Sequence, residues 1–320
     1  MTEITEEIFK CVMKGICYAS HLAKGAPLIS SRVKSDMSVV SLYDVVIQMI
    51  FCKLLEKYPI TIVSEEEDND FYKDTLKALQ TNNISQEYAY IKEFLIENEI
   101  SLEEPLKPVC HSLAGTGMEI ILDPIDGTRG FINSRSYSIV AACMKDKKVL
   151  FSIISCPKEN IVYYKWNMSG NGLSGYPHRR RVRTYSLSDS PHTSYSDFLT
   201  TLSLYVAISA EKTHSSPVLM EFLDRLGRLY PVHIVRMDGQ GKYACVATQK
   251  IDIFLRLPST KIQEKIWDHC AGIDMNEMSI VTDLHGIPIH PCTPPVYGVI
   301  ASHSQIFHSL SLNILKDLLM

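Results

Sequence analysis

The stretch "MEIILDPIDGTRGF", residues 118–131, passes from an apolar run to two carboxylates that are three positions apart. The apolar run predicts a buried strand, and Pro124 predicts an extended Asp123 at its end. Asp126 then lies on the following turn, so both carboxylates are held close together. Mg²⁺ prefers such oxygen ligands, and the stretch therefore predicts half of a metal site. An Asx turn followed by a helix cap is the alternative interpretation.

Two other acidic stretches also lie at the ends of predicted elements. "IVSEEED", residues 62–68, places Glu65 and Glu66 directly after a β run, and "IWDHCAG", residues 266–272, places Asp268 at the start of a predicted helix. A solvated charge run and a helix N-cap are the alternative interpretations of these two stretches. Three acidic groups at element ends favour one shared metal site.

The rest of the first 196 residues predicts helices followed by a β meander. Apolar spacing predicts helices at 6–24, 41–59 (closed by Pro59) and 85–98, and strands at 61–63, 118–122, 137–146, 148–157, 160–168 and 179–187. The meander predicts an antiparallel sheet. Residues 68–85 show no clear periodicity, and we interpret them as an insertion or loop.

From about residue 197 the pattern becomes one of alternating strands and helices. Strands are predicted at 204–209, 232–237, 251–257, 278–283 and 297–302, with helices at 216–229 and 239–249. This alternation is typical of layered α/β structure. We therefore expect two domains, an α+β domain at 1–196 that holds most metal ligands and an α/β domain at 197–320 that binds substrate.

Composition narrows the class of protein. With 46% hydrophobic and 21% charged residues the chain resembles a soluble globular protein. Its net charge of −4 argues against a broadly nucleic-acid-coating surface and still allows a local basic site. Nine dispersed cysteines without a CxxC pair favour a reducing compartment. The acidic start and the lack of a membrane-length apolar run lead us to expect a cytoplasmic protein with no membrane partner. The basic run at 178–183 is interpreted as one exposed strand face, not as a site for a nucleic acid polymer.

The motifs together resemble a known family. "DPIDGTRGF", "VSEEE" and "KIWDHCAG" resemble the three signature motifs of the Mg²⁺-dependent, lithium-sensitive phosphomonoesterase superfamily, which includes inositol monophosphatase and fructose-1,6-bisphosphatase. "TRGF" and "MDGQGKYACVA" are similar to the 3′(2′),5′-bisphosphate nucleotidase branch. The resemblance covers nearly the whole chain.

This resemblance implies a five-layered αβαβα sandwich and a site for two or three Mg²⁺ ions. The implied ligands of one ion are Glu65, Asp123 and the backbone carbonyl of Ile125, and those of a second are Asp123, Asp126 and Asp268. It also implies inhibition by Li⁺, and by extension Na⁺.

The implied reaction is hydrolysis of a phosphate monoester by metal-activated water. The resemblance assigns water activation to Asp44 and Thr128, with Glu65 or Glu66 sharing the role, and phosphate binding to the N–H groups of Gly127 and Thr128. A capping or surface aspartate is the alternative interpretation of Asp44.

Similarity to the nucleotidases suggests that Lys242 and Arg256 bind a second, unhydrolysed phosphate, although either can instead be a solvated charge. The expected substrate is 3′-phosphoadenosine 5′-phosphate. Glu211 replaces a histidine of those relatives, and Gly239 replaces a serine. Both departures weaken base recognition and favour inositol 1,4-bisphosphate as an alternative substrate, as in inositol polyphosphate 1-phosphatase.

Two alternatives of other classes remain open at this point. His269 beside Cys270 is the pair that suggests covalent catalysis, although adjacent helix residues point in different directions. A non-enzymatic acidic metal-binding protein would leave the three motifs unexplained.

Overall fold

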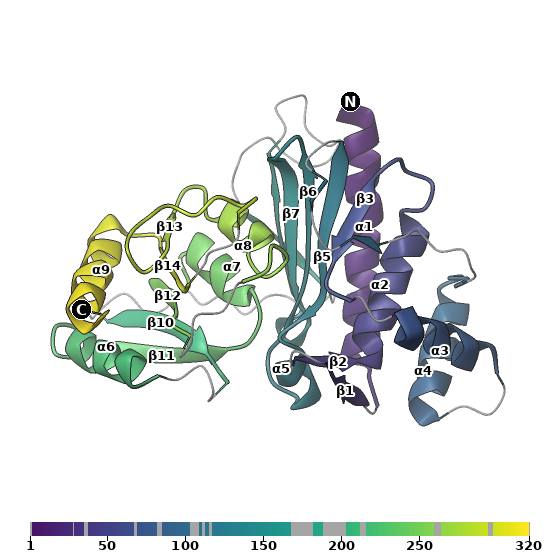
Figure 1. Ribbon diagram of the computed structural model, residues 1–320, viewed down its shortest axis with the longest axis horizontal. Coiled ribbons are helices and arrows are strands. Elements are labelled where there is room, and N and C mark those ends of the chain that lie inside the picture. Colours follow the sequence, from purple (N-terminus) through teal and green to yellow (C-terminus); the bar gives the residue numbers. More distant parts are fainter. Residues whose placement is uncertain are drawn as a thin grey trace.

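The structure is a computed structural model, and two large β-sheets organise it (Figure 1). It describes residues 2–27, 29–34, 38–66, 69–81, 85–102, 109–110, 113–114, 117–167, 182–187, 203–211, 216–258, 264–293 and 297–319. The predicted domain boundary near residue 197 and the first four residues of the basic run at 178–183 lie outside these ranges.

The first sheet comes from the N-terminal part of the chain. In spatial order its described strands are β4 (Val109–Cys110), β3 (Thr61–Ser64), β5 (Met118–Asp126), β6 (Ser138–Lys145), β7 (Lys148–Cys156), β8 (Ile161–Trp166) and β9 (Arg183–Ser186). The meander from β5 to β9 is antiparallel, as predicted, whereas β3 runs parallel to both β4 and β5. A small antiparallel pair, β1 (Ser31–Val33) and β2 (Val39–Ser41), lies outside this sheet.

The second sheet follows in the C-terminal part. Its described order is β11 (Val232–Met237), β10 (Leu204–Ser209), β12 (Ile253–Arg256), β14 (Val299–Ser302) and β13 (Ile280–Thr282). All five strands were predicted from short β-branched runs between turn residues.

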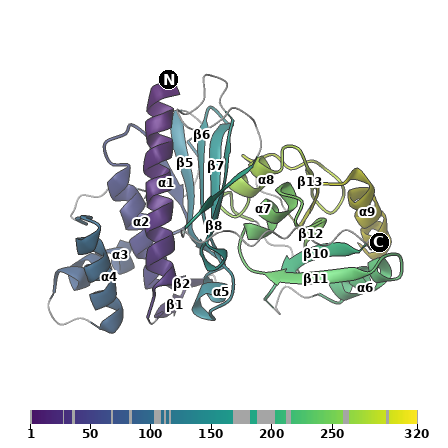
Figure 2. The same ribbon diagram turned by 180° about the vertical axis from the view of Figure 1, so that it is seen from behind.

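Helices cover both faces of each sheet. They are α1 (Thr2–Lys24), α2 (Leu42–Leu54), α3 (Asn69–Gln80), α4 (Gln86–Glu97), α5 (Thr128–Ile132), α6 (Pro217–Gly227), α7 (Gly241–Ala247), α8 (Cys270–Met275) and α9 (Gln305–Leu319), with a short 3₁₀ turn, η1, at Pro157–Glu159. Figures 1 and 2 show α1 and α2 outside the first sheet, α7 and α8 between the sheets, and α6 and α9 outside the second. This arrangement confirms the five-layered αβαβα fold.

The layers follow from the strand residues. Along β5, Ile120 and Leu122 belong to the core cluster under α1 and α2, whereas Ile121 belongs to the cluster that includes α8. Because successive strand residues face opposite sides, an uninterrupted apolar run buries a strand on both faces. The "MEIIL" run therefore places β5 inside the molecule with its carboxylates at the strand end.

Three sequence predictions were wrong in detail. Residues 69–80 form the helix α3, whose amphipathic pattern is hidden by its polar composition. Helix α2 ends at Leu54, five residues before Pro59, so the proline does not close it. Asp268 lies in the turn before α8, and His269 occupies the N-cap position.

All nine cysteines are free thiols, as the dispersed pattern predicted. None of the described helices combines the length and the apolar run that are needed to span a bilayer.

Candidate active site

The parallel pairing of β3 with β5 brings the first two acidic motifs together. Ser64 and Leu122 are the last aligned pair of residues in these two strands. Glu65 and Asp123 follow them directly, so both lie at the same edge of the sheet. Between Asp123 and Asp126 the register of β5 against β6 shifts, which marks a bulge around the proline. The predicted strand end with two neighbouring carboxylates is therefore present.

A cavity of about 270 Å³ lies at this edge. Among the residues that line it are most of the predicted site residues: Glu65, Asp123, Ile125, Asp126, Gly127, Thr128, Glu211, Gly239, Lys242, Arg256 and Asp268. They come from both sheets and from the turns before α5, α7 and α8. Asp44 and Glu66 lie behind this lining and are buried.

Asp44 joins the site from the first turn of α2. Its Oδ1 accepts a hydrogen bond from Thr128 Oγ1 at 3.3 Å, and its Oδ2 accepts the backbone N–H of Ser41 at 2.8 Å in a capping box. The capping interpretation is therefore correct, whereas a surface position is excluded because the side chain is fully buried. The same carboxylate both caps the helix and holds the hydroxyl beside the cavity, so the two interpretations of Asp44 do not compete.

Lys34 is a site residue that sequence reasoning missed. Its Nζ lies 3.3 Å from Glu65 Oε1 and 2.9 Å from Glu66 Oε2. Gln48 on α2 accepts the backbone N–H of Glu66 at 3.2 Å and donates to its carbonyl at 3.0 Å, so the acidic turn is clamped. Nothing in the residues near Lys34 marks it as a partner, because Glu65 and Glu66 are 31 and 32 positions away in the sequence.

The buried carboxyl groups repel one another. Burial raises the pKa of Asp123 well above its usual value, and the neighbouring charges of Glu65, Asp126 and Asp268 raise it further. Burial also raises the pKa of Asp126 to about 6, against the opposing charges of Lys242 and Arg256, and that of Asp268 to about 7. Such a cluster is costly when ionised and without cations.

These carboxylates fit Mg²⁺. Asp123 Oδ1 and Asp126 Oδ2 are buried and accept no hydrogen bond from any described residue. Hard anionic oxygens without a donor at the end of a cavity are what a divalent cation needs. The individual ligand assignments remain predictions.

Lys242 is not a solvated charge. It is buried in the first turn of α7, where its Nζ donates to the carbonyls of Met237 at 3.1 Å and Gly239 at 2.5 Å. Burial lowers its pKa to about 8, although the charge of Asp126 opposes this shift. The ammonium group is therefore held by the turn before α7, close enough to interact electrostatically with Asp126.

Gly127 and Gly239 let two turns of the site pack backbone against backbone. Both have positive φ, +90° and +75°, and a Cβ on Gly239 would lie 2.7 Å from the carbonyl oxygen of Asp126. A residue with a side chain is therefore strained at position 239 in this chain. The packing therefore requires a glycine at position 239. The same glycine also lacks the hydroxyl group that a serine would supply.

Arg256 is partly neutralised by a residue that the sequence analysis did not assign. Its Nε and Nη2 donate to the two carboxylate oxygens of Glu264, both at 2.8 Å. Burial of Glu264 opposes its ionisation, but His269 and Arg256 outweigh that effect and lower its pKa to about 2. Arg256 is therefore a tethered cation, not a freely solvated one.

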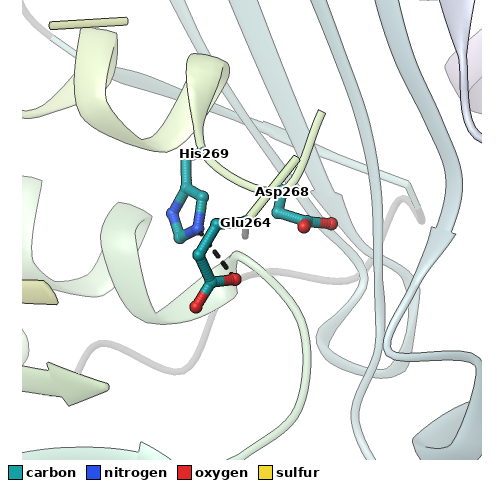
Figure 3. A group of neighbouring side chains, drawn as sticks. All are labelled: Glu264, Asp268 and His269. Carbon is teal, nitrogen blue, oxygen red and sulfur yellow. Dashed lines mark ion pairs between the residues drawn. The ribbon is translucent and has the colours of Figure 1, made fainter. Parts of the chain in front are cut away.

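The turn before α8 forms a compact polar group (Figure 3). Ligand atoms of Glu264, Asp268 and His269 lie within 4.8 Å of one another, a geometry that can hold a metal ion. Asp268 belongs both to this group and to the predicted Mg²⁺ ligands. Because Glu264 is bonded to Arg256, we assign Asp268 to the cavity side and Glu264 to the arginine.

The structure argues against covalent catalysis by Cys270. The thiol is buried, and burial raises its pKa well above the usual value. Its Sγ lies 3.7 Å from Met144 Sδ, while His269 Nδ1 lies 2.8 Å from the hydroxyl of Tyr243. The adjacent cysteine and histidine therefore have different partners, and a thiolate nucleophile is disfavoured.

Comparison with known proteins agrees with this geometry. Residues 37–319 match the inositol monophosphatase family. The chain belongs to this family. Among curated family relatives, a probable 3′(2′),5′-bisphosphate nucleotidase of Arabidopsis thaliana is 27% identical over 81% of this chain and 77% of its own length. The 3′(2′),5′-bisphosphate nucleotidase of Schizosaccharomyces pombe is 27% identical over 96% of this chain and 89% of its own length.

Solved structures of the inositol monophosphatase family share the fold. An IMPase of Thermotoga maritima superposes with a TM-score of 0.61 at 15% identity, over 100% of this chain and 98% of that chain. CysQ of Bacteroides thetaiotaomicron superposes with a TM-score of 0.56 at 15% identity, over 92% of this chain and 97% of that chain. At these identities the likeness concerns the fold alone.

Proposed function

We propose that the chain is a Mg²⁺-dependent phosphomonoesterase that removes the 3′-phosphate of 3′-phosphoadenosine 5′-phosphate. The observation that carries the proposal is the charge layout of the cavity. The cavity is lined both by the carboxylates Asp123, Asp126 and Asp268 and by the cationic side chains of Lys242 and Arg256. A substrate with two phosphates matches this lining, because one phosphate can meet metal ions at the carboxylates and the other can meet the two cations.

The residues have distinct roles in this proposal. Glu65, Asp123, Asp126, Asp268 and the carbonyl of Ile125 hold the metal ions. Bound Mg²⁺ supplies Lewis acidity and makes water a stronger nucleophile near neutral pH.

Thr128 orients the attacking water. Its hydroxyl group accepts a proton from that water and passes its own proton to Asp44, through the hydrogen bond of 3.3 Å between Oγ1 and Oδ1. Asp44 is suited to accept a proton, because burial raises its pKa to about 7 against the bonds from Ser41. The N–H groups of Gly127 and Thr128 bind the phosphate that reacts. Lys242 and Arg256 bind the phosphate that stays.

The names of the relatives support a nucleotide substrate. Two curated relatives that match over most of the chain are named as 3′(2′),5′-bisphosphate nucleotidases, one of them as a probable one. We expect a cytoplasmic enzyme that acts on this small soluble substrate and is inhibited by millimolar Li⁺.

The direct test is phosphate release from 3′-phosphoadenosine 5′-phosphate with and without Mg²⁺, with chromatography of the nucleoside product. We expect adenosine 5′-monophosphate to form only when Mg²⁺ is present. Formation of adenosine 3′-monophosphate would reverse the assignment of the two phosphate positions, and release without a divalent cation would contradict the metal assignment.

Inositol 1,4-bisphosphate is the second candidate substrate. Glu211 lines the cavity, where its carboxylate offers no aromatic face for stacking on a base. A site that depends on two phosphate contacts more than on the base admits other bisphosphates. Hydrolysis of this substrate at a rate lower than that of the nucleotide is the expected result.

A further inference from the structure

Arg256 presents only part of its guanidinium group to the cavity. The bonds to Glu264 occupy the Nε–H and one Nη2–H, both at 2.8 Å. An arginine has five N–H donors in a rigid plane, so the edge formed by Nη1 and Nη2 still carries donors. Since Arg256 lines the cavity and its side chain is 29% exposed, this second edge is the one available to an anion.

Glu264 is itself buried beside His269. Its side chain is 1% exposed, and Oε2 lies 3.4 Å from His269 Nε2 (Figure 3). The Nδ1 of His269 lies 2.8 Å from the hydroxyl of Tyr243, and the Tyr243 ring packs edge-on against Phe254 at 4.8 Å.

These contacts form a closed circuit. Phe254 and Arg256 belong to the same strand, β12. The contacts therefore begin and end on this strand, in the order Arg256, Glu264, His269, Tyr243 and Phe254. Two members of this circuit are sequence neighbours of predicted site residues in the cavity: Tyr243 follows Lys242, and His269 follows Asp268. Glu264 is the member that links the arginine to the other elements.

We infer that Glu264 is a positioning residue, which holds the guanidinium group of Arg256 so that its free edge binds the unhydrolysed phosphate of a two-phosphate substrate. An untethered arginine side chain would lose substantial rotamer entropy when it binds a phosphate. The Glu264 carboxylate fixes the side chain before binding, so this loss does not weaken the affinity, although it also neutralises part of the positive charge of Arg256. The inference rests on the proposed function, since it assigns the second phosphate to Arg256.

The test is Glu264→Gln, with kcat and KM measured on 3′-phosphoadenosine 5′-phosphate and on adenosine 3′-monophosphate at saturating Mg²⁺. We expect KM for the bisphosphate to rise about tenfold, as for loss of an oriented charge-assisted contact, while kcat and the monophosphate KM change less than about threefold. Equal losses on both substrates would indicate a merely structural role and overturn the inference.

Two controls separate positioning from folding. Glu221→Gln breaks a carboxylate–arginine pair of the same kind on the exposed face of α6, where Glu221 Oε1 lies 2.8 Å from Arg225 Nε, and should change neither KM. Glu264→Asp keeps the charge, and its bisphosphate KM should fall between those of wild type and Glu264→Gln. A Glu264→Asp variant with the full defect and a native melting temperature would contradict the inference.

A double-mutant cycle with Arg256→Met tests whether Glu264 acts through the arginine. Glu264→Gln should add nothing to the bisphosphate KM once Arg256 has been removed, whereas additive losses would overturn the inference. Calorimetric binding of adenosine 5′-monophosphate gives a readout without turnover, and both single variants should weaken it. If both single variants weaken this calorimetric binding but the wild type fails to hydrolyse the bisphosphate, the proposed function fails and the positioning role stands.

Discussion

At the scale of single residues, Asp123 is the carboxylate on which the proposed metal site depends most. It is buried, its Oδ1 accepts no hydrogen bond from the described residues, and the negative charges of four other acids disfavour its ionisation. Such a group lowers the stability of the metal-free protein, which is typical of a residue at a binding site.

We predict that Asp123→Asn abolishes hydrolysis while leaving the fold intact, because the amide cannot replace the anionic ligand that the proposal assigns to both ions. Phosphate release at saturating Mg²⁺ should fall at least about a hundredfold. The melting temperature in EDTA should equal or exceed that of wild type, since a buried charge is gone. Asp224→Asn, an exposed change on α6, is the control, and substantial turnover by Asp123→Asn would refute the shared-ligand role.

The pH dependence of metal binding follows from the same carboxyl groups. The folded-state pKa values of about 6 for Asp126 and about 7 for Asp268 lie above the unfolded-state values near 4. These groups therefore bind protons in the folded protein that the unfolded chain has released, and their contribution to stability decreases as the pH rises from about 4 to about 7.

We predict that Mg²⁺ raises the melting temperature more at about pH 8 than at about pH 5, because at the lower pH it must displace protons from these carboxyls. Differential scanning fluorimetry with millimolar Mg²⁺ and with EDTA measures the shift at each pH. Asp268→Asn should reduce the difference between the two shifts. Equal shifts at both pH values in the wild type would contradict the predicted protonation.

At the scale of elements, the contact between α7 and α8 sets the position of two cavity turns. Gly272 on α8 lies directly against Tyr243 on α7, and a Cβ at position 272 would be 2.2 Å from the tyrosine ring. A Cβ at Gly227, at the end of α6, would have no heavy atom within 4 Å.

We predict that Gly272→Ala lowers the free energy of unfolding by about 1–3 kcal/mol, because the ring must move to admit the methyl group. Gly227→Ala should leave it within about 1 kcal/mol of wild type or raise it slightly. Urea denaturation of both variants measures the difference. A Gly272→Ala protein as stable as Gly227→Ala would show that the two helices are not closely packed.

Local sequence patterns predicted most helices and strands correctly, because the formation of these elements depends on residues that are close in the sequence. The β5 to β9 meander is readable from β-branched runs separated by turns, and β5 is buried on both faces. Helix α3 was missed because polar residues outnumber its apolar face, whose partners come from elsewhere in the chain. The parallel β3–β4 pair was also missed, since β4 spans only Val109–Cys110.

At the scale of the whole molecule, one buried lysine joins the two halves of the chain. Lys165 on β8 is 1% exposed, and its Nζ donates to the carbonyl of Asp274 at 2.6 Å and lies 2.8 Å from Glu277 Oε2. Ser152 and Asn167 also donate to the Asp274 carboxylate. This network ties the first sheet to α8, which carries the turn of Asp268.

We predict that Lys165→Met lowers the free energy of unfolding by about 3–5 kcal/mol, because it leaves an acid buried without its cation. The double change with Asp274→Asn should recover part of this loss. Lys53→Met, which breaks an exposed pair with Glu56, should cost less than about 1 kcal/mol. If Lys165→Met costs no more than Lys53→Met, the network does not hold the halves together.

The site was predictable where one motif supplies several residues and unpredictable where the fold joins distant ones. The order of Asp123, Asp126, Gly127 and Thr128 places all four at one strand end. Lys34 contacts Glu65 and Glu66 across 31 and 32 positions of sequence, and Arg256 bonds Glu264 across eight, and neither contact follows a local pattern.

The central claim is that the cavity accepts a substrate with two phosphates, one for the metal ions and one for Lys242 and Arg256. The most direct measurement is kcat/KM with Mg²⁺ for 3′-phosphoadenosine 5′-phosphate, inositol 1,4-bisphosphate and inositol 1-phosphate, since these ratios report differential binding of the transition state. The nucleotide is predicted to exceed inositol 1-phosphate by at least about tenfold, with the inositol bisphosphate between them. A preference for inositol 1-phosphate would contradict the claim.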